Sequence, residues 1–120
     1  MSSLHRTITG DVLVQHLTQD ARMIDPSLVA EHGRSARTLV KEGPLRLTIM
    51  AIKAGGHLPA HSTDGPISVH VLKGEITFHA DDRDYPLCTG DVLVIAGGVE
   101  HAAHSTVGAE FLLTVVHLPS

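Results

Sequence analysis

Histidine is the residue type in this chain with the widest range of chemistry. Ten histidines occur among 120 residues, at positions 5, 16, 32, 57, 61, 70, 79, 101, 104 and 117. Imidazole is the commonest metal ligand in proteins, and it is also the side chain that exchanges a proton near neutral pH. Packing alone does not require so many, so we expect several to serve a binding or catalytic site.

Two glycine-bounded stretches single out His61 and His101. Residues 55–74 read GGHLPAHSTDGPISVHVLKG, and residues 90–105 read GDVLVIAGGVEHAAHS. Each combines glycine turns with an apolar run that is typical of a strand, and His101 follows the second glycine turn of its stretch by three residues. We interpret them as the two halves of a small β-barrel, with both imidazoles directed into its mouth.

The elements that must position these histidines are short strands. From Ser35 onward, β-branched runs are separated by Gly, Pro and Asp, which predicts an all-β sandwich or barrel. The predicted strands lie near residues 36–41, 45–53, 57–61, 67–73, 75–80, 85–88, 92–96, 101–105 and 110–117. Residues 92–96 and 112–116 are apolar on both faces, so they belong to a packed barrel wall or to a subunit interface. A homodimer explains them economically.

The first part of the chain carries a helical pattern instead. An apolar stripe at steps of three to four residues predicts an amphipathic helix over about residues 11–24, formed by Leu13, Leu17, Ala21, Ile24 and Leu28. Asp25-Pro26 ends this helix and begins a second short one, which Gly33 closes. We therefore expect a helical segment over residues 1–34 and a barrel domain over residues 35–120. The helix either caps the barrel mouth or swaps onto a neighbouring subunit.

Composition excludes several classes of partner. Nine basic and 13 acidic residues give a net charge of −4, which repels nucleic acid and anionic membranes. The N-terminal region has no signal-peptide pattern and no apolar run reaches a membrane span, so a cytoplasmic location is expected. The single cysteine, Cys88, lies beside Leu87 in an apolar run, which predicts a small buried side chain.

The two stretches resemble the paired signature motifs of small single-domain cupins. In the first motif, Gly55, His61 and Gly74 fall in register, and Pro59 lies where many members have proline. The resemblance covers roughly residues 45–117 and implies a jelly-roll barrel whose motifs lie on facing strands. It also implies that His61 reaches the barrel interior.

The second motif is the more specific of the two. Gly90, Gly98 and His101 match it in full register, while Ala96 replaces its proline and Ser105 replaces its asparagine. The resemblance therefore implies that His101 shares the interior with His61.

The resemblance also implies a divalent metal, Zn, Fe, Ni or Mn, but two of its four ligands are replaced. Thr63 stands where the motif has a second histidine, and Ile67 where it has glutamate. Only His61 and His101 remain, whereas tight binding of a transition metal needs at least three strong ligands. The candidates for a third ligand are His57, Asp64 and His70.

Each of these candidates has an obstacle. On an extended strand His57 lies roughly 13 Å from His61. Asp64 must fold back from its loop, and His70 has the opposite parity to Ile67, so only a bulge turns it inward. By the same parity His104 points away from His101. Taken singly, His57, His70, His79, His104 and His117 are expected at the surface or at an interface.

Three functions remain open. In the leading one, a metal-free apolar cavity binds a small molecule, oriented by His61 and His101, as a sensor, carrier or degenerate enzyme. Its walls are expected from Ile49, Ile67, Val69, Val71, Val94 and Leu113, and its ligand-binding residues are His61, Thr63, Ile67, Val69, His101 and Ser105. The alternatives are a metal-dependent enzyme of dioxygenase or isomerase type and a non-catalytic dimeric interaction module.

Overall fold

The structure, a computed structural model, describes residues 12–17 and 26–118 and consists almost entirely of antiparallel strands. This confirms the predicted all-β jelly roll with a short N-terminal helix. The elements are α1 Pro26–His32, β1 Arg34–Glu42, β2 Leu45–Ile52, β3 His57–His61, β4 Ile67–Ala80, β5 Arg83–Cys88, β6 Val92–Ile95, β7 His101–His104 and β8 Ala109–Val116. No helix in these two ranges is long and apolar enough to cross a membrane.

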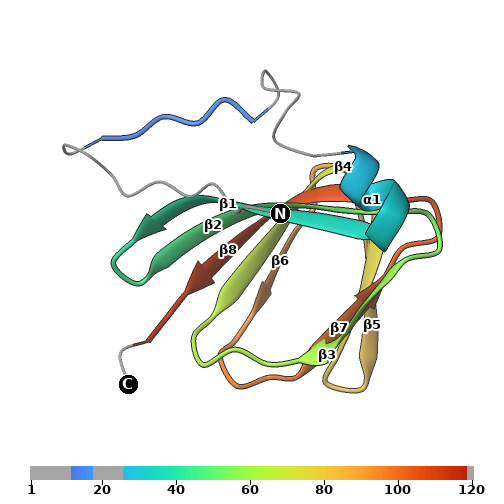
Figure 1. Ribbon diagram of the computed structural model, residues 1–120. Coiled ribbons are helices and arrows are strands. Elements are labelled where there is room, and N and C mark those ends of the chain that lie inside the picture. The colour runs from blue at the N-terminus through green and yellow to red at the C-terminus, as the bar shows by residue number, and fades with distance from the viewer. Residues whose placement is uncertain (1–11, 18–25, 119–120) are drawn as a thin grey trace.

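The strands form two sheets that curl toward each other (Figure 1). The first has the order β1-β2-β8-β4-β6, and the second has the order β5-β4-β7-β3. Strand β4 belongs to both, because its first half pairs with β8 and β6 and its second half with β5 and β7. The sheets therefore enclose an interior between two facing surfaces.

Gly74 is the corner at which β4 passes from one sheet to the other. It has φ +84°, and a Cβ there would collide with the carbonyl oxygen of Gly108. A bulge between Val71 and Lys73 precedes it, and bulges increase the local twist of a strand. The prediction of two strands, 67–73 and 75–80, is thus wrong, because glycine lets one continuous strand turn this corner.

Apolar residues are buried on both faces of the first sheet. The interior between the sheets holds the main core, which includes Val69 and Val71 at 0% exposure and Phe111 at 1%. A second cluster of Leu39, Val40 and Ile49 lies apart from this core, and Leu13, Leu17, Leu47, Leu72 and Leu112 pack against it. The outer-face position of Leu112 explains why β8 is apolar on both sides.

The N-terminal part confirms one predicted helix and corrects the other. Helix α1 ends at His32 and is closed, as expected, by Gly33, which has φ +82° and donates its N–H to Val29 O at 2.8 Å. Residues 12–17, however, form no helix. Val12 and Val14 are exposed, while Leu13 and Leu17 pack against the second cluster, so the segment alternates as an extended chain does. The remainder of the predicted helix, and with it Ala21 and Ile24, lies outside the described residues.

Candidate functional site

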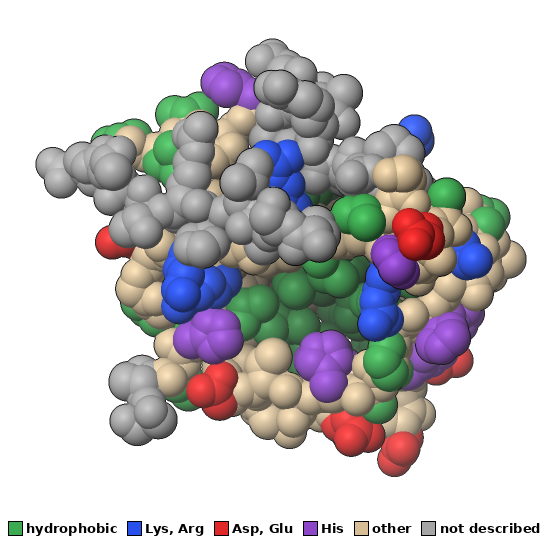
Figure 2. Space-filling view, viewed as in Figure 1, with side chains coloured by type: hydrophobic (Ala, Val, Ile, Leu, Met, Phe, Trp, Pro, Cys, Tyr) green, Lys and Arg blue, Asp and Glu red, His purple; other side chains and the backbone are tan. Residues whose placement is uncertain are grey.

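A cavity of about 340 Å³ lies between the two sheets. Figure 2 shows a hollow with an apolar floor, with Lys or Arg and His side chains at its rim. Four polar residues line it, namely Arg34, His61, Thr63 and His101. The rest of the lining is apolar and consists of Met50, Leu58, Pro59, Ile67, Phe78, Ala102, Phe111, Leu113 and Val115.

A bulge in β3 turns His61 into this cavity. Leu58 pairs with Ala103 and His61 pairs with His101, so three residue steps on β3 match two on β7. The extra residue lies at Pro59-Ala60, and proline, which has no N–H to donate, is accepted at bulges. Without the bulge, strand alternation would place His61 on the face opposite to Leu58. The bulge therefore brings His61 opposite His101 on the inner face.

The glycine turn before β7 positions His101. Gly98 has φ +81°, and its N–H donates to Thr63 O at 2.7 Å. At Gly97, a Cβ would collide with the carbonyl oxygen of Asp64. These contacts hold the turn against the loop that follows β3, and His101, at 3% exposure, begins its strand directly beside His61.

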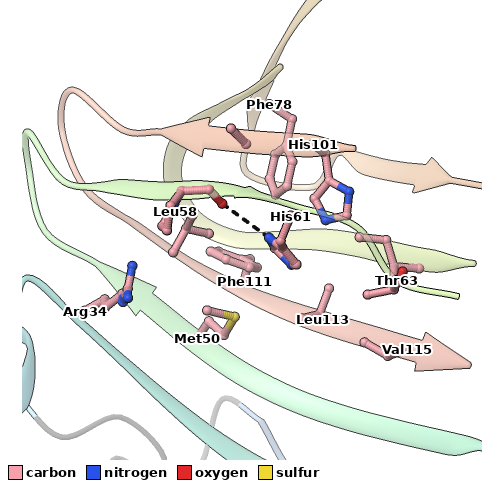
Figure 3. A pocket seen from close by; sticks show the side chains of 13 residues that line it. Arg34, Met50, Leu58, His61, Thr63, Phe78, His101, Phe111, Leu113 and Val115 are labelled. Carbon is pink, nitrogen blue, oxygen red and sulfur yellow. Dashed lines mark hydrogen bonds between the residues drawn. The ribbon is translucent and has the colours of Figure 1, made fainter. Parts of the chain in front are cut away.

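The two imidazoles meet edge to face. Their ring centroids are 4.5 Å apart, and the ring planes make an angle of 62°. Nδ1 of His61 contacts Pro59 O at 3.3 Å, as Figure 3 shows, and Nδ1 of His101 contacts Val99 O at 3.0 Å. Since a carbonyl oxygen only accepts hydrogen bonds, each Nδ1 carries a hydrogen.

The Nε2 atoms carry the remaining hydrogen-bonding capacity of the pair. Neither has a hydrogen-bond partner in the described part of the chain. No fully buried side-chain nitrogen or oxygen there lacks a partner, so Nε2 of His101 keeps some exposed surface, and His101 is one of the residues that line the cavity. In a neutral ring this atom accepts a hydrogen bond or binds a metal, and in a protonated ring it donates.

The ring of Phe78 packs near His101. The Phe78 ring lies 6.4 Å from the ring of His101 and 6.3 Å from that of Phe111, with the two phenyl planes at 83°. The contact between the two phenyl rings is edge to face, a favourable arrangement, whereas the ring of His101 is tilted by 40° to that of Phe78. Phe78 thus joins His101 to Phe111 within the lining of the cavity.

Four of the six residues predicted to form the cavity wall do not line the cavity. Ile67 and Leu113 do line the cavity, but Val69 and Val71 are buried in the core beside it. Ile49 belongs to the second cluster, since β2 directs Met50 to the interior in its place.

Val94 is the clearest error in that wall. It is 68% exposed, because it pairs with Ser68 on the outer face, while its neighbours Leu93 and Ile95 face inward opposite Val69 and Ile67. The run 92–95 is apolar at every position, so its sequence alone does not indicate which residues face inward.

Two predicted ligand-binding residues also have structural partners. Thr63 lines the cavity and donates its hydroxyl hydrogen to Gly65 O at 2.9 Å. Ser105, at 2% exposure, donates to Glu75 O at 2.5 Å and accepts from Gly108 N at 2.8 Å. Ser105 does not line the cavity. Its hydroxyl group uses both its donor and its acceptor to hold together the corner at which β4 changes sheets.

The residues present do not fit the tightly held metal that the cupin resemblance implies. In the described ranges no three His, Cys, Asp or Glu side chains converge on one point. His57 pairs with His104 on the outer face, and His70 pairs with Leu112, also outside. Asp64 Oδ1 accepts from Gly65 N at 3.0 Å and lies 4.0 Å from His117 Nδ1. Two imidazoles therefore remain without a third ligand.

Arg34 is a cavity residue that sequence reasoning missed. It begins β1, pairs with Ile52 on the inner face, and its Nη1 reaches His57 O at 3.4 Å across the mouth. Figure 3 shows it beside Met50 and Leu58. Its position just after Gly33 placed it in the predicted helical segment, so no signal in the sequence pointed to the cavity.

A row of polar side chains on the outer face of the second sheet accounts for three other histidines. His57 lies opposite His104, whose Nδ1 is 2.7 Å from Nε2 of His79, and the rings of these last two stack with centroids 4.8 Å apart. Asp84 Oδ1 accepts from His79 Nδ1 at 2.5 Å. These contacts join β7, β4 and β5 and lie outside the cavity, which agrees with the expected surface position of these residues.

Cys88 is exposed, so its predicted burial is wrong. It is the last residue of β5, where the turn to β6 brings Asp91 Oδ2 within 3.5 Å of the thiol and 2.9 Å of the backbone nitrogen. The hydrogen bond and the negative charge of Asp91 raise the pKa of the Cys88 thiol above its ordinary value. Cys88 therefore lies at the start of the turn to β6, and its thiol has low reactivity.

Solved structures share this architecture. A conserved protein of unknown function from Streptococcus pyogenes is 24% identical, with a TM-score of 0.70 over 100% of this chain and 98% of its own. An RmlC-like cupin from Desulfovibrio desulfuricans is 23% identical, with a TM-score of 0.72 over 88% of this chain and 97% of its own. At these identities the likeness shows the fold.

A cupin 2 conserved barrel domain protein from Leptotrichia buccalis is 28% identical, with a TM-score of 0.66 over 69% of this chain and 40% of its own. No protein of curated function matches the sequence. The cupin-domain family model matches residues 48–117, which include both glycine-bounded stretches and both cavity histidines. The chain therefore belongs to the cupin family.

Proposed function

We propose that this cupin binds a small, largely apolar molecule in the cavity between its sheets and orients it by hydrogen bonds to Nε2 of His61 and His101. The observation that carries the proposal is the pair itself. Both Nδ1 atoms are engaged by backbone carbonyls, which leaves both Nε2 atoms for a ligand. Around them the lining is mainly hydrocarbon, with few polar groups, as in typical small-molecule sites.

The apolar surroundings make these two contacts selective. A buried polar atom without a partner costs about 1–3 kcal/mol, so a ligand that offers a hydroxyl or N–H to His101 is favoured over one that covers the ring with hydrocarbon. The apolar wall supplies affinity through burial, at roughly 25 cal/mol per Å². Shape and two acceptor positions thus define the molecule that fits. A sensor, a carrier and a metal-independent isomerase all use such a site.

A resident metal is the weaker candidate. The carbonyl contacts of His61 and His101 resemble those that orient metal-binding histidines. Yet Thr63 directs its hydroxyl to its own loop, and Ile67 supplies only hydrocarbon where the family motif has a carboxylate. We therefore propose that the cavity binds its ligand through His61 and His101 without a metal, and that any divalent metal binds substoichiometrically.

Two measurements test this function. Metal analysis of protein purified without a histidine tag distinguishes the metal-free cavity from a metal-dependent enzyme. The metal-dependent enzyme requires stoichiometric metal that is lost in both His61→Ala and His101→Ala. A thermal-shift screen with a broad library of small neutral compounds tests the cavity, because a ligand that binds the folded state raises Tm. We expect hits that depend on both histidines. No hit across the library would favour the interaction module.

We also propose a homodimer formed through β6. This strand pairs only with β4 among the described strands, and its outward Val92 and Val94 are 59% and 68% exposed. An edge strand with exposed apolar side chains is suited to pairing with a second copy. Light scattering after size exclusion tests this, with the expectation that Val92→Lys together with Val94→Lys yields monomer. A wild-type monomer at high concentration would contradict it.

A further inference from the structure

The lining of the barrel cavity carries a formal charge of one sign. Arg34 contributes a guanidinium, and no Asp or Glu lines the cavity in the part of the chain that the structure describes. We propose that the ligand of this site is a small monocarboxylate with an apolar body, whose carboxylate pairs with Arg34. This inference rests on the proposed function and adds the chemical class of the ligand.

The position of Arg34 supports such a pairing. It lies on the inner face of β1 and reaches across the mouth to β3 through one long contact, 3.4 Å from Nη1 to His57 O. A guanidinium has five N–H donors, and this contact occupies one. None of the ion pairs between described residues involves Arg34. The planar fork therefore has donors left that match a carboxylate in bidentate geometry.

The charge balance of the site favours a single negative charge. A cation is repelled by Arg34 and finds no carboxylate in the lining. A phosphate monoester brings a charge of about −1.5 to −2 at neutral pH, which one guanidinium does not neutralise. A carboxylate brings one charge, which one guanidinium neutralises, and the Nε2 atoms of His61 and His101 remain for a hydrogen bond with another group of the ligand.

Size and lining define the rest of the molecule. Small-molecule pockets commonly measure about 300–1,000 Å³, so a cavity of about 340 Å³ suits a compact ligand. Met50 and Leu58 lie next to Arg34 in Figure 3, with Phe111 and Leu113 further inside. An aromatic or branched aliphatic body extending inward from the carboxylate contacts all four.

Matched pairs of acids and amides test this inference, because each pair differs in charge and hardly in shape. Binding of phenylacetate and phenylacetamide, and of 4-methylpentanoate and 4-methylpentanamide, is measured by calorimetry on the wild type and three variants. We expect each acid to bind at least about tenfold more tightly than its amide. Arg34→Gln should remove this preference, Arg34→Lys should retain part of it, and Arg83→Gln, which loses an exposed charge on β5 outside the cavity, should change nothing.

Each result decides the matter. Equal binding of acid and amide by the wild type would overturn the proposal that Arg34 pairs with a ligand carboxylate. A preference for the acid that persists in Arg34→Gln would overturn it as well. So would failure of all four probes to bind. The screen of neutral compounds then shows separately whether the cavity function stands, because its hits do not depend on Arg34. If Arg34→Gln does not fold, the comparison of acid with amide on the wild type still decides.

Discussion

The rings of His61 and His101 meet edge to face with centroids 4.5 Å apart, although the two residues are forty positions apart in the sequence. Two local features produce this contact, the bulge at Pro59-Ala60 in β3 and the glycine turn before β7. Each ring is held through Nδ1 and offers Nε2. The pair is thus built by backbone geometry that the rest of the barrel enforces.

Truncating the two histidines should affect stability unequally. His101→Ala removes a buried ring, its bond to Val99 O and its contact with Phe78, so we expect a loss of about 2–4 kcal/mol in the free energy of unfolding. His61 lies exposed at the mouth, and His61→Ala should cost less than about 1 kcal/mol. Urea denaturation measures both. Equal losses would show that the pair is not arranged as described.

The corner at Gly74 should tolerate no side chain. Gly74→Ala places a Cβ against the carbonyl oxygen of Gly108 and also forces alanine to positive φ, so we expect a loss of more than about 3 kcal/mol. Gly43→Ala is the matched control, because Gly43 also has positive φ but has open space around it. It should cost only about 1–2 kcal/mol. Similar losses of stability in both variants would contradict the close approach of Gly74 to Gly108 at this corner.

Ser105 should support the fold and leave ligand binding unchanged. Ser105→Ala removes two hydrogen bonds at a buried position, which predicts a loss of about 2 kcal/mol in chemical denaturation. The exposed neighbour variant Thr106→Ala should lie within about 0.5 kcal/mol of the wild type. If Ser105→Ala instead keeps full stability and weakens the binding of screen hits, its hydroxyl has the ligand role that the sequence suggested.

The two metal ligands that Thr63 and Ile67 replace can be restored by substitution. Thr63→His combined with Ile67→Glu places a third imidazole and a carboxylate in the lining that already holds His61 and His101. We expect stoichiometric Zn²⁺ binding by this double variant and lower stability of its metal-free form, because a carboxylate replaces a side chain that is 4% exposed. Added Zn²⁺ should raise its Tm. Stoichiometric metal in the wild type would contradict the account instead.

The reactivity of Cys88 should depend on Asp91. A raised pKa means that less thiolate exists at a given pH, so alkylation by iodoacetamide should be slow near neutral pH and rise as the pH passes above the ordinary thiol value. Asp91→Asn keeps an oxygen for the turn but removes the charge, so the rate profile should move to lower pH. Labelling rates between about pH 7 and pH 10 measure this shift. An unchanged profile would show that Asp91 does not control the thiol.

The fold was readable from the sequence because strands, glycine turns and motif spacing all agree. The positions of His61 and His101 followed from the same spacing. What could not be read was the register between strands. Strand β6 is apolar at every position, so nothing in its sequence indicates that Val94 faces outward while Leu93 and Ile95 face inward.

Two further features depend on contacts between segments that are distant in the sequence. The bulge in β3 becomes visible only when Leu58 and His61 are matched to their partners on β7. The extended form of residues 12–17 is set by packing of Leu13 and Leu17 on the second cluster, which competes with their helical spacing. Arg34 was missed for the same reason, since only the closure of the two sheets brings it to the mouth.

The most direct test of the central claim is the ring-nitrogen NMR spectrum of the histidines, with His61→Gln and His101→Gln as assignment controls. At pH well above the ordinary imidazole pKa, both rings should carry hydrogen on Nδ1 and none on Nε2. Addition of the tightest hit from the screen should shift the Nε2 signals of both rings and leave both Nδ1 signals in place. Hydrogen on Nε2, or a bound hit that moves neither Nε2 signal, would contradict the account.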